Sequence, residues 1–229
     1  MEGAPRFMAL TLTEMHTRVS QMLMDTGEEI WPNAILDEAI RQALTAYSLS
    51  SPCEQSAILT IPERGDLDLS SLPGLAGVTG VRWPYEPDNP EALQPANRVT
   101  GWRCWRDMDK NTLELRTLPG TNPAEGDSLL VRYVSGHSVD GLDGAEVSTI
   151  PLIHISLLIH GSAGYAALFR ALDKVENRSY GSRRTEPALL QSWANAVLER
   201  YQRDLDRLRR QHSPAERQPA WRMDAWESC

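Results

Sequence analysis

The chain has 229 residues, a length that fits one domain, or one domain with a large insertion, around a sizeable core. Hydrophobic residues make up 41% and charged residues 24%, which is typical of a soluble globular protein and argues against wholesale disorder. Lysines and arginines number 23 against 31 aspartates and glutamates, for a formal net charge of -8. This acidity argues against a protein that coats nucleic acid, because non-specific binding to phosphates requires a positive surface.

The cysteines and the longest apolar run indicate the cellular setting. Cys53, Cys104 and Cys229 are odd in number and widely spaced, which fits neither a disulfide framework nor a zinc site, so reduced thiols in a cytoplasm are expected. The first residues lack the pattern of a signal peptide. The apolar run 150–169 contains a proline, two histidines and two glycines, and Arg170 follows it. These features favour a buried core helix over a membrane span.

The first predicted helix begins at a capping box. Thr11 and Glu14 have the required spacing, and Leu10 can pack against Met15 in a hydrophobic staple. Gly27 is the predicted left-handed end of this helix.

A second helix is predicted over residues 33–47, after a turn at Trp31. Asn33 is its predicted cap. Arg41 follows Asp37 by four residues, so an ion pair between them is expected.

The apolar pattern then changes to a period of two, which is typical of strands. Pro, Gly, Asn and Asp clusters separate six short runs: residues 56–62, 66–72, 77–85, 101–107, 112–119 and 128–136. In the fourth run, Trp102, Cys104 and Arg106 are expected on one face of the strand. Arg103 and Trp105 are expected on the other. Six short strands indicate a small antiparallel sheet or sandwich.

Two more helices are predicted after the strands. The third, over residues 150–172, has a thin middle at 161–164 (Gly-Ser-Ala-Gly) that permits close helix approach. The fourth opens at Thr185, with Pro187 in its first turn. Its predicted apolar stripe is Leu190, Trp193, Val197, Tyr201, Leu205 and Leu208.

The order of these elements predicts an α+β fold. Residues 1–55 and 145–211 are expected to form a trunk of four helices, two from each end of the chain. Residues 56–144 form an inserted small antiparallel β lobe, and residues 212–229 an extended C-terminal tail. The outer helices must meet to bury their apolar stripes, which closes the insertion into a lobe.

Few residues show the pattern of a catalytic or metal-binding site. Asp140, Asp143 and Glu146 are the nearest approach to a metal loop, but they lack the alternating ligands of an EF-hand. His154 and His160 are six apart, so they do not share a helix face as a metal pair would. We therefore expect no enzyme, no cofactor and no metal.

Two segments are candidates for contacts with other molecules. The charged end of the fourth helix offers Arg203, Arg207, Arg209 and Arg210, either as a solvated helix end or as a surface for an acidic partner or phosphates. The tail carries an unusual aromatic pattern. It is either an arm that orders on a neighbour or a segment buried against its own domain, and its candidate residues are Trp221, Arg222 and Trp226.

Several stretches, taken in order, resemble the head-to-tail adaptor (connector, or neck) proteins of tailed bacteriophages. The resemblance extends to about Gln211 and is carried by "LTLTEMHTRVSQML", "IWPNAILDEAIRQALTAYS", "GDLDLSSLPGLAGVTGVRWPY", "STIPLIHISLLIHGSAGYAALFRAL" and "WANAVLERYQRDLDRLRR".

The resemblance implies a structural virion protein. Its copies form a ring, usually of twelve, between the portal protein of the capsid and a stopper or tail-completion protein. Double-stranded DNA passes through the ring without specific binding, including at ejection. The place implied is the virion neck, assembled in the host cytoplasm, with no membrane. C-terminal arms in such families often reach into the portal, which would suit residues 212–229.

Two alternatives from other classes stay open. One is a DNA-binding module that uses the arginine-rich last helix. The other is a metal-dependent enzyme that uses Asp140, Asp143 and Glu146.

Overall fold

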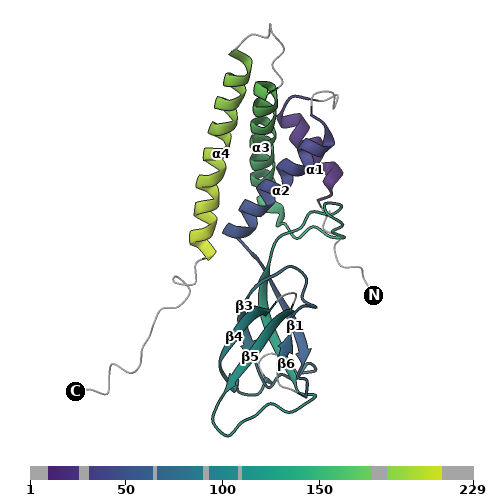
Figure 1. The fold of residues 1–229 in the computed structure, drawn as a ribbon, viewed down its shortest axis with the longest axis vertical. Helices are drawn as coiled ribbons and strands as arrows, with labels where there is room; N and C mark the ends of the chain where they lie inside the picture. Colours follow the sequence, from purple (N-terminus) through teal and green to yellow (C-terminus); the bar gives the residue numbers. More distant parts are fainter. Residues whose placement is uncertain are drawn as a thin grey trace, which may run out of the picture. The chain divides into compact units, whose positions relative to one another are not determined.

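The computed structural model describes residues 10–25, 31–63, 66–89, 93–107, 110–176 and 185–212. The chain is an α+β protein that divides into two units (Figure 1). The helical unit takes the residues up to Ser51 and those from His137 onward, and the β unit is Pro52–Gly136. Both boundaries come earlier in the chain than the predicted 56 and 144.

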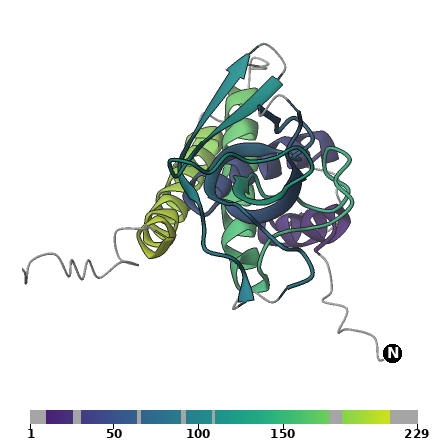
Figure 2. The ribbon, with the colours of Figure 1, turned by 90° about the horizontal axis from the view of Figure 1, so that it is seen from below.

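The helical unit buries one hydrophobic core, to which all four of its described α-helices contribute. In two perpendicular views, α3 lies between α4 and the α1–α2 pair (Figures 1 and 2). Core residues include Met15, Leu36, Ile40, Leu158 and Tyr201, each at most 1% exposed. The described elements are α1 (Leu12–Met22), α2 (Asn33–Ser50), the 3₁₀ turn η2 (Leu152–His154), α3 (Ile155–Glu176) and α4 (Thr185–His212).

Helix α1 starts as the capping box predicts and ends earlier than expected. The Thr11 hydroxyl accepts a hydrogen bond of 3.2 Å from the backbone N–H of Glu14. The predicted end at Gly27 is wrong, because α1 stops at Met22, and Gly27 itself lies outside the described residues. Met24 takes the left-handed conformation (φ 58°) instead and closes the helix in a Schellman-type pattern.

Helix α2 begins without the predicted side-chain cap. Pro32 occupies the cap position and Asn33 is already the first helical residue, so Asn33 does not cap the helix. The carbonyl of Pro32 accepts from the N–H groups of Ile35 and Leu36, at 2.9 and 3.2 Å. The rigid backbone of proline suits the entry into a helix, which explains why no side-chain cap is needed to set the turn.

The thin middle of α3 allows α4 to approach it closely. A Cβ atom at Gly161 would lie 2.7 Å from the Tyr201 ring, and one at Gly164 would lie 2.9 Å from Leu198. The Tyr201 hydroxyl donates a hydrogen bond of 2.6 Å to the Ala43 carbonyl of α2. Glycine at 161 therefore lets one aromatic ring join three helices.

The buried face of α4 follows the predicted stripe except at Trp193. Trp193 was expected in the core but is 38% exposed, whereas its neighbour Ala194 is fully buried. At 3.6 residues per turn, Ala194 lies about 20° around the helix from Tyr201, whereas Trp193 lies about 80° from it, at the edge of the buried face. Tyr201, Leu205 and Leu208 are buried as predicted.

The segment Leu152–Asp173 is long and apolar enough to cross a membrane by length and composition. In this structure it packs against α1, α2 and α4. Leu158, Ala163 and Ala167 are fully buried there. Burial in the helical core accounts for this apolar composition.

The contacts of His137 fix the point at which the chain returns to the helical unit, directly after the last strand. Its backbone N–H donates to the Ser48 hydroxyl at 2.9 Å, and its Nε2 lies 2.9 Å from the Ser51 carbonyl. On the other side, Nδ1 lies 3.0 Å from the Thr149 hydroxyl. The loop after the strands is thereby bonded to α2.

The β unit consists of two three-stranded antiparallel sheets, with strand orders β1-β6-β3 and β2-β5-β4. Between them lies a separate apolar core that includes Leu113, Leu129, Val131 and Tyr133. The strands are β1 (Cys53–Thr60), β2 (Leu67–Asp68), β3 (Leu75–Arg82), β4 (Val99–Asp107), β5 (Lys110–Thr117) and β6 (Ser128–Ser135).

Candidate interaction surfaces

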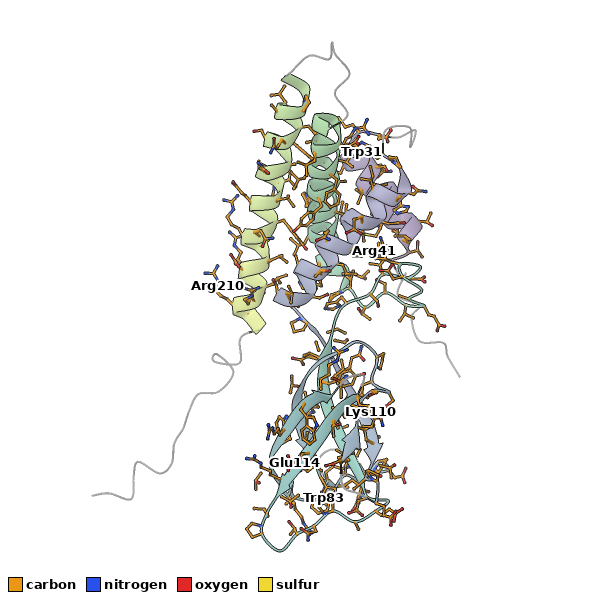
Figure 3. The ribbon with its side chains drawn as sticks, in the orientation of Figure 1. Trp31, Arg41, Trp83, Lys110, Glu114 and Arg210 are labelled. Atoms are coloured by element: carbon orange, nitrogen blue, oxygen red, sulfur yellow. The ribbon has the colours of Figure 1, made fainter. Side chains whose placement is uncertain are left out.

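The four predicted arginines of α4 are exposed on its last turns. At 3.6 residues per turn, Arg203, Arg207 and Arg210 lie on one side of the helix, and Arg209 lies on another. Figure 3 shows Arg210 projecting from the final turn. Three of the four arginines are thus brought together as a row.

One member of this arginine row is paired with an aspartate of the same helix, and another is bonded to the helix backbone. Arg207 Nη1 lies 3.0 Å from Asp204 Oδ1, and Arg210 Nε donates to the Asp206 carbonyl at 3.2 Å. The Arg207 side chain is still 70% exposed, and such surface pairs hold their partners weakly. The row remains accessible to an acidic partner. The other predicted contact residues lie outside the described residues: Trp221, Arg222 and Trp226.

The acidic loop after the β unit is bonded to helices. Arg41 Nε donates to both carboxylate oxygens of Asp143, at 2.9 and 3.0 Å. This side-chain hydrogen bond raises the pKa of Arg41 and lowers the pKa of Asp143. The Asp140 carbonyl accepts from the Leu12 N–H at 2.8 Å. Asp143 thus braces the loop against α2 through its carboxylate, and Asp140 contributes its backbone carbonyl. The described part of the chain contains no group of three or more metal-ligating side chains.

The charge of Asp37 raises the pKa of Arg41, as their spacing predicts, but the direct ion pairs of Arg41 are with other carboxylates. Arg41 contacts Asp143 and Glu38, and Asp37 lies 2.7 Å from Nε2 of His16 on α1. Tertiary packing offers each side chain a closer partner from another element, so the pair along the helix acts through its charges and not through a direct bond.

Strand β4 carries a surface that sequence reasoning did not single out. Five consecutive side chains are exposed: Trp102, Arg103, Cys104, Trp105 and Arg106. The two tryptophans are 38% and 36% exposed. They belong to opposite faces of the strand, so neither face of β4 is fully covered. The sequence does carry a sign of this surface in the run W-R-C-W-R. The side chains on each face of the strand include an arginine, so neither face is uniformly apolar.

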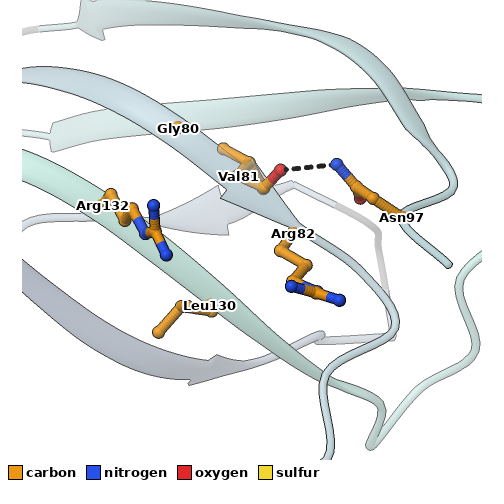
Figure 4. A pocket seen from close by; sticks show the side chains of 6 residues that line it. All are labelled: Gly80, Val81, Arg82, Asn97, Leu130 and Arg132. Atoms are coloured by element: carbon orange, nitrogen blue, oxygen red, sulfur yellow. Dashed lines mark hydrogen bonds between the residues drawn. The ribbon is translucent and has the colours of Figure 1, made fainter. Parts of the chain in front are cut away.

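The β unit also contains a small cavity of about 280 Å³ (Figure 4). Arg82 Nη2 donates to the Pro95 carbonyl at 3.1 Å, and Asn97 Nδ2 donates to the Val81 carbonyl at 3.2 Å. These bonds make the polar side chains part of the cavity wall. The residues that line it are Gly80, Val81, Arg82, Asn97, Leu130 and Arg132.

No protein-family model matches the chain, and no curated protein matches it. Similar solved structures include three chains of gene transfer agent particles, each covering 87% of this chain and 92% of its own. One is in the virion of the native particle, with 20% identity and a TM-score of 0.29. Another is in the neck of the native particle computed with C12 symmetry, with 18% identity and a TM-score of 0.29. The third is in the neck of the empty particle computed with C6 symmetry, with 19% identity and a TM-score of 0.30.

Proposed function

We propose that the chain is a structural, non-catalytic subunit of a phage-like virion. It acts as an adaptor that joins the portal of the capsid to a tail or stopper protein in the virion neck. The observation that carries this proposal is the organisation of the chain. A β unit is inserted between α2 and α3, and helices from both ends of the chain share one core. This is the order that the resemblance to adaptor proteins implies.

The physical properties support a ring through which DNA passes. A closed ring needs two different contact faces on each subunit, and two separately packed units can supply them. The net charge of -8 disfavours tight binding of phosphates, which suits a channel through which DNA must slide. We propose twelve copies in this ring, assembled in the host cytoplasm.

The exposed row of Arg203, Arg207 and Arg210 is the proposed contact with an acidic surface of the portal. Reversing all three to glutamate should weaken portal binding strongly. Arg18→Glu is a matched control, because Arg18 is also an exposed arginine in a helix and pairs with Glu14.

The test is co-assembly with the portal protein of the same particle, followed by native mass spectrometry and negative-stain imaging. A defined number of copies bound to the portal is the expected result. A chain that never binds its portal would contradict the proposal. Removing residues 213–229 should weaken portal binding and leave the fold intact if the tail is an arm, and should unfold the helical unit if it is part of the core.

The same row is the one observation that favours a DNA-binding module. A gel shift that weakens steeply with added salt would support that role, because phosphate contacts release counterions. We expect no shift at low salt. We also expect the same thermal stability in calcium, magnesium or EDTA, since Asp143 is bonded to Arg41.

A further inference from the structure

We propose that the small cavity in the β unit is a binding site for the carboxylate of an aspartate or glutamate of a partner protein. Arg82 and Arg132 are the residues that bind this carboxylate. The proposal goes beyond the adaptor function and does not depend on it, because it is argued from the β unit alone.

The register of β3 and β6 places the two arginines on the same face of their sheet. Gly80 pairs with Arg132, and two residues further on Arg82 pairs with Leu130. Val81 lies between Gly80 and Arg82 and points the other way, into the core of the β unit, where it is 6% exposed. The two arginines are therefore diagonal neighbours, about 7–8 Å apart, so both long side chains can reach one ligand. Figure 4 shows both beside the cavity.

The guanidinium of Arg82 is held in place and lacks a negative partner. Its Nη2 donates to the Pro95 carbonyl at 3.1 Å, which fixes its orientation. Its Nε is buried and has no hydrogen-bond partner within the described ranges, and no carboxylate there forms an ion pair with Arg82. A half-buried charge has lost hydration that a counter-charge would replace. This unbalanced charge points to an anionic ligand, which would meet the Nη atoms because Nε is covered.

The cavity has the size and the walls of a site for one acidic side chain. Its volume of about 280 Å³ lies just below the ~300–1,000 Å³ of sites that hold whole small molecules, so an end group fits it. Leu130 is half-buried in the wall and can pack against the methylene groups of the entering side chain. Gly80 keeps the space open, since a Cβ atom there would already lie 3.7 Å from Arg132 Cβ.

A protein carboxylate suits this site better than the phosphates of DNA. Guanidinium groups bind a planar carboxylate through pairs of parallel hydrogen bonds. DNA requires a broad positive surface. Here Glu54 lines a neighbouring hollow together with Arg132, and the whole chain has a net charge of -8. Positive charge among the residues that line the cavity is confined to two arginines, which is enough for one acidic side chain.

The test is an NMR titration of the isotope-labelled full-length protein. The probe is the blocked tripeptide Gly-Glu-Gly, and blocked Gly-Gln-Gly is its uncharged match. The Nε–H signal of Arg82 is assigned by its loss in Arg82→Lys. We expect Gly-Glu-Gly to shift this signal and the amide signals of residues 80–82 and 130–132, with a Kd of roughly 1–10 mM. Shifts that do not saturate, or equal shifts with both peptides, would overturn the proposal.

Single substitutions assign the binding to these residues. Arg82→Gln should weaken binding of Gly-Glu-Gly roughly tenfold, because hydrogen bonds to a charged group are lost. Gly80→Leu should also weaken it, by filling the cavity while both arginines remain. Arg103→Gln is the control, since Arg103 is an exposed arginine on β4 of the same unit. Unchanged binding in Arg82→Gln, or an equal loss in Arg103→Gln, would overturn the site even if Gly80→Leu fails to fold.

A short DNA duplex tests the other source of an anion. We expect it to leave the signals of residues 80–82 and 130–132 unchanged at low salt, because the two arginines are not part of a broad positive surface. Saturable shifts of these signals with DNA, and none with Gly-Glu-Gly, would overturn the assignment to a carboxylate.

Discussion

Tyr201 of α4 and Trp105 of β4 are both large aromatic residues in segments rich in arginine, and the structure gives them different surroundings. Tyr201 is 1% exposed, its ring lies against Gly161 and its hydroxyl bonds to the Ala43 carbonyl. Trp105 is 36% exposed on an outer strand. The difference shows that the part of the chain opposite an aromatic residue decides whether that residue is buried or exposed. Gly161 opposite the Tyr201 ring makes that ring part of the core, whereas Trp105 lines a surface pocket between β4 and β3 and stays partly exposed.

The largest expected effect comes from filling the space under Tyr201. Gly161→Leu should lower the free energy of unfolding of the helical unit by about 3 kcal/mol, because the side chain would overlap the ring. Urea unfolding followed by helical circular dichroism measures this. Gly101→Ala in β4 is the control, since nothing lies within 4 Å of a Cβ atom there. Equal loss in both variants would contradict the packing described for α3 and α4.

A smaller effect is expected from the Tyr201 hydroxyl alone. Tyr201→Phe keeps the ring and removes the 2.6 Å hydrogen bond, leaving the Ala43 carbonyl without this donor. The loss should be roughly 1–2 kcal/mol in the same urea measurement. Burial raises the pKa of Tyr201, so the hydroxyl stays a donor across the range in which the protein is handled. A variant as stable as the parent would mean that this bond adds nothing to the core.

The junction at His137 should make stability depend on pH. Burial lowers the pKa of His137, although its bonds to the Ser51 and Thr149 carbonyls act in the opposite direction. Below the ordinary histidine pKa of about 6.5, the unfolded chain therefore binds more protons than the folded chain. The stabilisation is present above that pH and is lost as the pH falls. Urea unfolding at about pH 7.5 and 5.5 should show this, and His137→Gln should flatten the difference. If His137→Gln leaves the stability difference between the two pH values unchanged, groups other than His137 cause it.

The smallest effect on folding is expected at the β4 edge. Trp105→Thr should lower the stability of the β unit by about 1 kcal/mol or less, because the ring is partly exposed and threonine suits a strand. Urea unfolding followed by near-UV circular dichroism measures this effect. Unfolding of the β unit would show that Trp105 is needed for the core of that unit, as Tyr201 is for the core of the helical unit.

Much of the architecture could be predicted, because helix and strand patterns are local. The capping box at Thr11 and the buried Tyr201 and Leu205 of α4 follow from spacings of three, four and seven residues. The candidate arginine row could also be found, since its members lie within two turns of one helix.

Other features depended on contacts between distant parts of the chain. Arg41 was paired with Asp37 from sequence, but its partner Asp143 lies 102 residues away. The apolar pattern predicts Trp193 in the core and passes over Ala194, because the sequence gives the period of a stripe but not the width of the face that a neighbouring helix covers. The position of β4 at the end of its sheet follows from strand order, which hydrophobic alternation does not specify.

By itself, the sequence determined the kinds of element, their order and the acidity of the chain, because these are properties of neighbouring residues and of composition. The tertiary structure decided which side chains became core, brace or exposed surface. Those roles depend on what the fold places opposite each residue. Gly161 makes Tyr201 part of the core, Asp143 makes Arg41 a brace, and the outer position of β4 leaves Trp105 exposed.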